Sequence, residues 1–259
     1  GNATVCIENL LVMIAWTDSR FSDTEIFARK NATGNPLHSA HTLDWAYSTG
    51  AAGSSAVTDM VTDTKGNVFL TGNFQSAVDF DPDMDLHILN SVGGDDIFIS
   101  KTSPSGDVLW ATRIGGPGED HVNSIAMDRE GNIIVSGSFH ETVDFDPGPN
   151  VFPLSAGENG DAFITKLDES GEFLWAIQIT GDGFNEIRSG KTDASNNIFV
   201  TGHFEETADF DPTSGVSSLT SNGQEDIFLA KFTPEGQLTW VHGIGGPGSD
   251  SGRGVTVTL

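Results

Sequence analysis

The residues best suited to chemistry are paired aspartates that recur along the chain. The tetrapeptide Asp-Phe-Asp-Pro occurs three times at a spacing of 65 residues, and the first copy continues with two further aspartates. Alternate side chains of an extended segment point the same way, so the paired carboxylates share an edge while the phenylalanine packs opposite. Carboxylate oxygens suit Ca²⁺. We therefore predict calcium sites whose ligands are Asp79, Asp81, Asp83, Asp85, Asp144, Asp146, Asp209 and Asp211.

A second interpretation of the same motif involves no metal. Each aspartate could accept hydrogen bonds from backbone N–H groups of a tight turn, with the proline fixing the following bend. The first copy also lacks the glycine and the glutamate found at positions six and twelve of an EF-hand loop. Both interpretations stay open at this point.

The composition limits the classes of partner. There are 37 acidic against 12 basic residues, a formal net charge of −25, which repels nucleic acid and anionic membrane surfaces and suits hard cations. A single cysteine, Cys6, excludes an internal disulfide and makes a cysteine-zinc site improbable. The longest apolar run, residues 10–16, is too short to span a membrane and no charged leader precedes it, so we expect a mature or excised segment without membrane insertion.

The elements that must position these aspartates follow from the same repeat. The period of 65 residues also carries a tryptophan at Trp45, Trp110, Trp175 and Trp240, and a lysine at Lys101, Lys166 and Lys231. Within one unit, residues 121–128, 132–139, 161–167 and 172–179 are short runs typical of strands, and residues 142–146 and 151–154 predict an extra hairpin. Four strands per unit are typical of a propeller blade.

We therefore expect an all-β protein, a β-propeller built from four 65-residue blade units in one domain, residues 1–259. The units cover about residues 1–50, 51–115, 116–180 and 181–246, with a closing strand at 251–258. In the favoured alignment this closing strand pairs with the N-terminal segment and leaves no bare edge. The rival alignment gives the first unit its own inner strand at residues 3–7, leaves 251–258 as a surplus strand and opens a route to self-association.

The repeat resembles a known family. The motifs that carry the resemblance are Ile114-Gly115-Gly116-Pro117-Gly118-Glu119-Asp120, Gly131-Asn132-Ile133-Ile134-Val135-Ser136-Gly137 and Asp161-Ala162-Phe163-Ile164-Thr165-Lys166-Leu167. Over residues 43–258 they resemble the bacterial β-propeller repeats called SBBP, whereas residues 15–20 and 23–30 resemble blades of sialidase-like or TolB-like propellers. The resemblance implies a propeller fold and a bacterial protein that is extracellular or at the cell surface, but it implies no reaction.

The default functional face is one rim of the propeller. The glycine-rich connectors at 115–120, 181–185 and 245–250 should emerge there beside the insertion hairpins. Asp120 and Asp250, with Asn185 at the equivalent place, are predicted to close turns. The repeated tryptophans are predicted to pack between blades, and the repeated lysines to pair with repeated acids along a solvated edge.

No catalytic residue can be assigned, because the sequence has no nucleophile elbow, phosphate-binding loop or dinucleotide motif. If the protein is an enzyme, the candidates are residues that depart from the repeat, namely His121, His140, Arg188 and His203. We predict a secreted, acidic, calcium-stabilised propeller that acts as a binding or structural module for a protein or glycan ligand. The alternatives are a calcium-dependent hydrolase of lactones, esters or phosphotriesters, and a glycan-binding lectin with one site per blade.

Overall fold

The structure is a computed structural model that describes the backbone of residues 3–8, 11–17, 24–30, 43–51, 54–81 and 87–257, and the side chains of residues 54–81 and 87–257. All regular elements in these ranges are β-strands. The described residues contain no helix long and apolar enough to cross a membrane. Gly1, Asn2, Asp83 and Asp85 lie outside the described residues.

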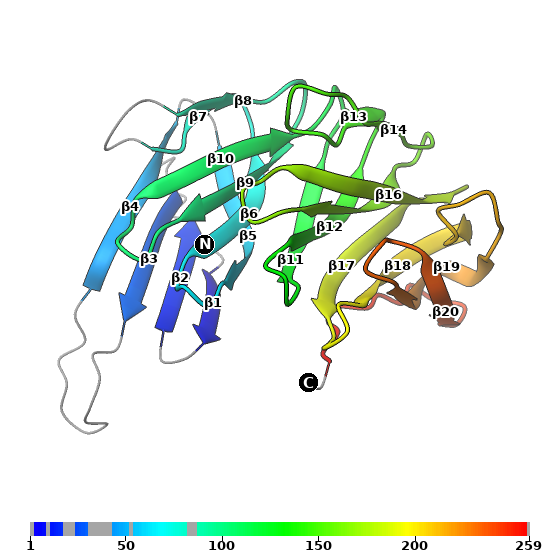
Figure 1. The fold of residues 1–259 in the computed structure, drawn as a ribbon. Helices are drawn as coiled ribbons and strands as arrows, with labels where there is room; N and C mark the ends of the chain where they lie inside the picture. The colour runs from blue at the N-terminus through cyan, green and yellow to red at the C-terminus, as the bar shows by residue number, and fades with distance from the viewer. Residues whose placement is uncertain are drawn as a thin grey trace.

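The strands form antiparallel four-stranded meanders that follow one another along an arc (Figure 1). The first contains β1 (Ala3–Glu8), β2 (Leu11–Thr17), β3 (Thr24–Lys30) and β4 (Leu43–Ala51). The second contains β5 (Ser55–Thr62), β6 (Val68–Phe74), β9 (Asp96–Thr102) and β10 (Val108–Ile114). The third contains β11 (His121–Met127), β12 (Ile133–Phe139), β15 (Asp161–Leu167) and β16 (Phe173–Gly181), and the last contains β17 (Asn185–Thr192), β18 (Ile198–Asp209), β19 (Ser218–Phe232) and β20 (Leu238–Ile244).

The predicted insertion hairpins are confirmed, and each joins two meanders. They are β7 (Ala77–Asp79) with β8 (Ile88–Asn90), β13 (Thr142–Asp144) with β14 (Pro153–Ser155), and the extended ends of β18 and β19. Each hairpin pairs with the end of the outermost strand of the preceding meander, through the partners Gly50 and Asp79, Gly115 and Asp144, and Thr180 and Asp209. The Asp-Phe-Asp-Pro motif therefore begins where neighbouring meanders meet.

The first strands of successive meanders pack against one another, as they do around a propeller axis. The innermost strand β11 contacts both β5 and β17. The carboxylate of Asp59 on β5 accepts hydrogen bonds from Ser124 Oγ (3.2 Å) and the Ile125 N–H (3.0 Å) on β11. This arrangement of antiparallel meanders is consistent with the predicted β-propeller.

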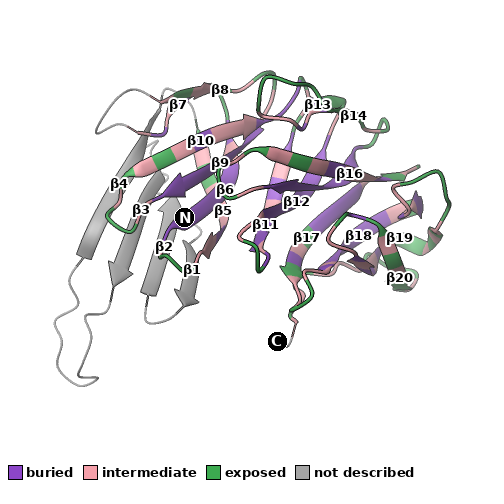
Figure 2. Cartoon of the chain, viewed as in Figure 1, coloured by how far each residue is buried: buried purple, intermediate pink, exposed green. Residues whose placement is uncertain are grey.

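The core lies between neighbouring meanders. Strands β9, β12 and β15 are buried along their whole length, whereas the outer strands β10 and β16 alternate between covered and exposed positions (Figure 2). The middle phenylalanine of each described motif, Phe80, Phe145 or Phe210, is buried among rings of the second and third strands. Phe145 lies 5.2 Å from Phe139 and 5.0 Å from Phe163 between ring centroids.

The repeated lysines and tryptophans also serve this packing. Lys166 Nζ lies 2.8 Å from Asp128 Oδ2 and Lys231 Nζ 3.7 Å from Asp193 Oδ2, so the predicted pairing with a repeated acid is confirmed for these two lysines. Lys101 Nζ donates to the carbonyl oxygen of Glu169 (2.8 Å). Lys101 and Lys166 are buried, so the predicted solvated edge is wrong for them. Burial raises the pKa of Asp128, but the hydrogen bonds from Lys166 and Asn132 outweigh it and hold that pKa below its usual value. The Trp175 ring packs against Gly236 in a turn of the next meander, as inter-blade packing predicts.

The predicted closing strand is wrong in this structure. Residues 251–257 form no strand, and the Gly252 N–H donates instead to the carbonyl oxygen of Gly202 on β18 (3.2 Å). The place beside β2 that closure would need is taken by β1, which pairs with β2 from Ala3 to Glu8. The first unit therefore has its own inner strand, as the rival alignment predicts, but the surplus strand of that alignment is not formed over residues 251–257.

The motif phenylalanines should contribute most to stability. Replacing Phe145 by Ala should lower the free energy of unfolding by about 3–5 kcal/mol, because the substitution leaves a cavity between two meanders. Val151→Ala is the matched control on the same hairpin, since Val151 is 77% exposed, and it should change stability by less than about 0.5 kcal/mol. Urea unfolding measures both values, and equal losses would contradict this account of the core.

Candidate functional site

The first aspartate of each motif organises the hairpin that follows it. Asp144 Oδ1 accepts hydrogen bonds from the N–H groups of Asp146 (3.2 Å) and Phe152 (2.8 Å). The same two contacts recur at Asp79, which binds the N–H groups of Asp81 and His87, and at Asp209, which binds those of Asp211 and Ser217. The turn-forming role that the sequence left open is thus present in all three copies.

The second aspartate of the second and third motifs, Asp146 or Asp211, binds backbone groups of the turn that follows it. Asp146 Oδ1 accepts the Gly148 N–H (2.8 Å), and Asp211 Oδ1 accepts the hydroxyl (2.7 Å) and the N–H (2.9 Å) of Thr213. These bonds hold the pKa of Asp211 below its usual value. Within the described ranges, no three His, Cys, Asp or Glu side chains gather in a way that could hold a metal. The predicted calcium sites stay a prediction.

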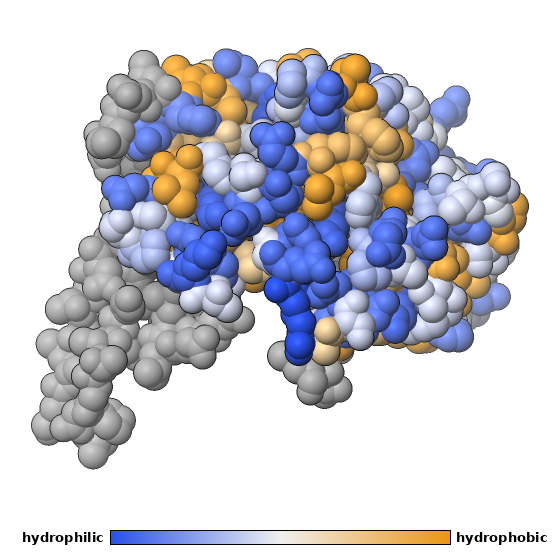
Figure 3. Space-filling model, viewed as in Figure 1, coloured by the Kyte–Doolittle hydropathy of each residue, from blue (hydrophilic) through white to orange (hydrophobic). Residues whose placement is uncertain are grey.

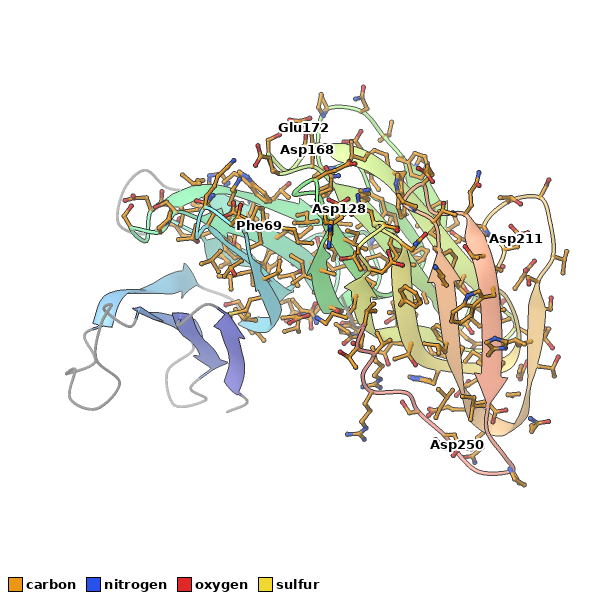
Figure 4. All side chains as sticks on the ribbon, turned by 60° about the horizontal axis from the view of Figure 1, so that its bottom comes forward. Phe69, Asp128, Asp168, Glu172, Asp211 and Asp250 are labelled. Carbon is orange, nitrogen blue, oxygen red and sulfur yellow. The ribbon has the colours of Figure 1, made fainter. Side chains whose placement is uncertain are left out.

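The connectors and the insertion hairpins share one rim, as the sequence predicts. The Gly94 N–H donates to the carbonyl oxygen of Gly118, and the Asp182 N–H donates to that of Thr207. A Cβ on Gly118 would lie 2.8 Å from the Cβ of His140, which shows how closely a connector approaches the next hairpin. Asp211 in a hairpin and Asp250 in a connector nevertheless lie well apart (Figure 4).

Asp120, Asn185 and Asp250 close the connectors, as predicted. The side chain of Asp120 accepts the N–H groups of Gly116 (2.8 Å) and His140 (3.3 Å), and Asp250 accepts the Gly246 N–H (2.9 Å). Asp120 is fully buried. Burial raises the pKa of its carboxyl to about 6.

Three buried aspartates that sequence reasoning missed lie beside the connectors. Asp96 and Asp161 begin β9 and β15, Asp226 lies at the equivalent repeat position within β19, and all three are at most 2% exposed. Burial raises the pKa of Asp96, against the lowering effect of the Arg113 guanidinium 2.6 Å from its Oδ2. The signal available in the sequence was that these aspartates recur without change at the period of the repeat.

Two of the enzyme candidates meet at Glu186, a buried residue that was not predicted. Arg188 Nη2 lies 2.7 Å and His203 Nδ1 3.7 Å from Glu186 Oε2, and Ser251 Oγ lies 3.4 Å from the same His203 nitrogen. Burial lowers the pKa of His203, although Glu186 and Glu225 act in the opposite direction. His203 is therefore a candidate proton acceptor with a serine hydroxyl beside it.

The other two candidates lie at separate places. His121 contacts Asn73, with 3.2 Å between the ring Nδ1 and the amide nitrogen. His140 Nδ1 lies 2.9 Å from the carbonyl oxygen of Glu119, and its ring stacks on that of Phe184 at 6.0 Å between centroids. The structure therefore does not assemble the predicted candidates into one centre.

A cavity of about 520 Å³ opens on the rim between the second and third meanders. Its lining combines backbone of the connector and the hairpin with the side chains of Glu119, His140, Glu141 and Glu158. A second cavity of about 440 Å³ lies between the hairpin at Phe152 and the motif residues Asp209 and Asp211. Both cavities are large enough for a small ligand or for side chains of a partner.

No family model matches the chain. It is 27% identical over 231 residues to the uncharacterized WD repeat-containing protein L264 of Acanthamoeba polyphaga mimivirus, a match that covers 79% of this chain and 17% of that protein. It is 22% identical over 182 residues to the regulatory protein FlaEY of Caulobacter vibrioides, covering 70% of this chain and 18% of that protein. The chain thus spans less than a fifth of the length of either relative.

The similarity to a WD repeat-containing protein agrees with the architecture. WD repeats form four-stranded propeller blades, and the described strands form successive antiparallel four-stranded meanders. Together these findings indicate a repeat protein of the β-propeller type.

The hydrogen bonds of the first motif aspartates can be tested in one hairpin. Asp144→Ala should lower the free energy of unfolding by about 1–3 kcal/mol, because two backbone N–H groups lose their acceptor. Asp144→Asn should cost less, since the amide oxygen still accepts. Asp146→Ala is the control, because the Gly148 N–H that it caps belongs to an exposed residue. Urea unfolding that ranks the control as the most destabilised variant would contradict the turn-forming role.

Proposed function

We propose that the protein is a β-propeller that acts as a binding or structural module, with the rim as its contact surface. The observation that carries this proposal is a difference between rim and core. Rim residues change from one repeat unit to the next, whereas core residues such as the motif phenylalanines stay the same. Glu119 lines the larger cavity at a position held by Phe184 and Ser249 in the next units, while the motif phenylalanines do not change. A constant scaffold with varied loops is the usual design of a binding protein.

The partner we propose is a protein or a glycan. The net charge of −25 disfavours nucleic acid and anionic lipid and attracts basic groups. Hydrophilic residues cover much of the described face seen in Figure 3, interrupted by small apolar patches, which suits a polar rather than a broadly apolar contact.

The family and the setting are part of the proposal. The motif resemblance supports an SBBP-type repeat in a secreted protein, extracellular or at the surface of a bacterium. We also propose that residues 1–259 form one domain with the blade units stated above. Because residues 251–257 form no strand in the structure, self-association through them stays part of the proposal.

A hydrolase is the second candidate function. Ser251 Oγ lies 3.4 Å from His203 Nδ1, and the opposite ring nitrogen of His203 lies 4.0 Å from Glu225 Oε1. A serine beside a histidine that contacts a carboxylate is the combination that nucleophilic catalysis uses. The buried position of His203 and the length of these contacts favour the binding module over the enzyme.

The calcium part of the proposal predicts a metal-dependent melting temperature. If the two carboxylates of a motif bind Ca²⁺ in the native state alone, Ca²⁺ at millimolar concentration should raise Tm by several degrees, and EDTA should lower it. The triple variant Asp79→Asn, Asp144→Asn, Asp209→Asn keeps acceptors for the backbone N–H groups but loses the charges, so its Tm should not respond to Ca²⁺. Differential scanning calorimetry that shows no response in the parent protein would remove calcium and leave the turn-forming role.

The contact surface is tested by removing two acids from the rim. Glu119→Ala with Glu158→Ala should weaken binding at least tenfold on arrays of glycans and of basic peptides. The matched control is Glu169→Ala with Glu172→Ala, which removes the same charge from the turn between β15 and β16 (Figure 4). That turn precedes the first residue of β16, whereas the rim connector at residues 181–185 lies at the opposite end of the same strand.

The outcomes separate the functional alternatives. Equal loss in both double variants would contradict a site on the rim, and glycan binding that EDTA abolishes would support the lectin. Turnover of an ester, lactone or phosphotriester that is lost in Ser251→Ala and His203→Ala would establish the hydrolase instead.

A further inference from the structure

A pair of acidic or amide side chains recurs at the described junctions between meanders. Each pair joins a repeated aspartate of the third strand to the residue that ends the following connector. The three pairs are Asp96 with Asp120, Asp161 with Asn185, and Asp226 with Asp250. In the first two pairs both side chains are at most 1% exposed.

The middle pair shows how such a site is held together when its second member is neutral. Asn185 Nδ2 donates to Asp161 Oδ1 (3.4 Å), and the Gly181 N–H donates to the same oxygen (3.1 Å). The other oxygen of Asp161 accepts the Gly157 N–H (3.1 Å). One carboxylate is thus paired with one amide donor.

The first pair lacks that donor, and the equivalent connector N–H, that of Gly116, donates to Asp120 rather than to the strand aspartate. Asp96 Oδ2 accepts the Val92 N–H (3.0 Å) and the Arg113 guanidinium (2.6 Å), while Asp96 Oδ1 has no hydrogen-bond partner among the described residues. Asp120 uses its oxygens as acceptors for the N–H groups of Gly116 and His140. Two carboxylates therefore share an enclosed site that contains a single guanidinium.

The site is too tightly packed for solvent to relieve this arrangement. A Cβ on Gly115 would clash with Asp96 Cγ, so this position of the connector accepts no side chain. An unpartnered buried carboxylate oxygen costs free energy comparable to a lost hydrogen bond, and two adjacent buried charges repel. A proton shared between the acids removes both penalties.

We propose that Asp120 is a proton-binding site, whose neutral carboxylic acid donates a hydrogen bond to Asp96 Oδ1 and so joins the second and third meanders. The protonated acid has the shape of Asn185, the residue at the equivalent place in the next junction. The proton comes from solvent during folding, so no bond other than O–H forms or breaks.

The charged and titratable groups around the pair do not replace this proton. Arg113 on β10 is engaged by Asp96 Oδ2, and Asp95 and Glu119 add further negative charge. The His140 ring contacts the carbonyl oxygen of Glu119, and it is the backbone N–H of His140 that reaches Asp120. A positive charge on His140 would partly offset the negative charge of the second carboxylate. The test of the proposal must therefore follow the titration of the Asp120 carboxyl itself.

The direction of the pH dependence follows from the pKa of about 6 that burial gives Asp120, above the ordinary aspartate value of 3.8. The native state keeps the proton while the unfolded chain releases it between these values, so stability falls as the pH rises. The stabilisation is complete below pH 4, decreases through pH 6 and is absent above about pH 7.

The experiment compares thermal melts at pH 5 and pH 8 in EDTA for the full chain and three variants. Asp120→Asn supplies a permanent donor and should raise Tm at pH 8 by roughly 4 °C, with a smaller change at pH 5. Asn185→Asp creates the acid pair at the next junction and should lower Tm at pH 8 more than at pH 5. Glu158→Gln removes one exposed charge from the same rim and should leave the difference between the two pH values unchanged.

A direct titration keeps the proposal falsifiable if a variant does not fold. The carboxyl carbon-13 resonance of Asp120 in the parent protein should titrate with a midpoint near pH 6. A midpoint below about 4.5, or an Asp120→Asn variant whose Tm depends on pH as the parent's does, would overturn the proposal. Ca²⁺ that raises the parent Tm at pH 8 but not that of Asp120→Asn would also overturn it, because the pair would then bind a metal instead.

Discussion

The backbone N–H groups of the turns need hydrogen-bond acceptors, and the described part of the structure depends on how the chain supplies them. A chain with 31 glycines among 259 residues changes direction often, and each tight turn leaves N–H groups that no strand partner can satisfy. Aspartate carboxylates supply the acceptors. Asp63, Asp128 and Asp193 each bind N–H groups in the turn between the first and second strands, and the motif aspartates do so in the hairpins. Much of the large negative charge therefore has a structural use.

The sequence predicted the local structure well because one period repeats the same strand and turn signals. The third unit shows this, since residues 161–167 were expected as a strand and β15 has these bounds. Contacts between units were harder to predict. Asn123 Nδ2 reaches Glu186 Oε1 (2.8 Å) from the neighbouring unit, and neither residue repeats along the chain. The N-terminal edge was predicted wrongly because its degenerate unit fits two alignments, and pairing of β1 with β2 decides between them.

The candidate site was only partly visible in the sequence for a related reason. An aspartate at the start of a strand, such as Asp96, has the sequence context of an exposed turn residue, and only its neighbours in space make it a buried acid. The rim was easier to predict, because propeller connectivity places connectors and insertions together. Its cavity depended on side chains such as Glu119 and His140 that no period specifies.

The hairpins that cross from one meander to the preceding one bear on how the chain folds as it is synthesised. Asp144 pairs with Gly115 and Asp209 with Thr180, so the outer edge of each blade is completed by residues that leave the ribosome later. The outer edge of a newly synthesised blade therefore stays uncovered until roughly thirty further residues have been translated, at about 5–20 residues per second. A gene duplication or deletion would preserve the contact between each hairpin and the preceding blade only if it added or removed whole repeats. This requirement gives a physical reason why the period is constant at 65 residues.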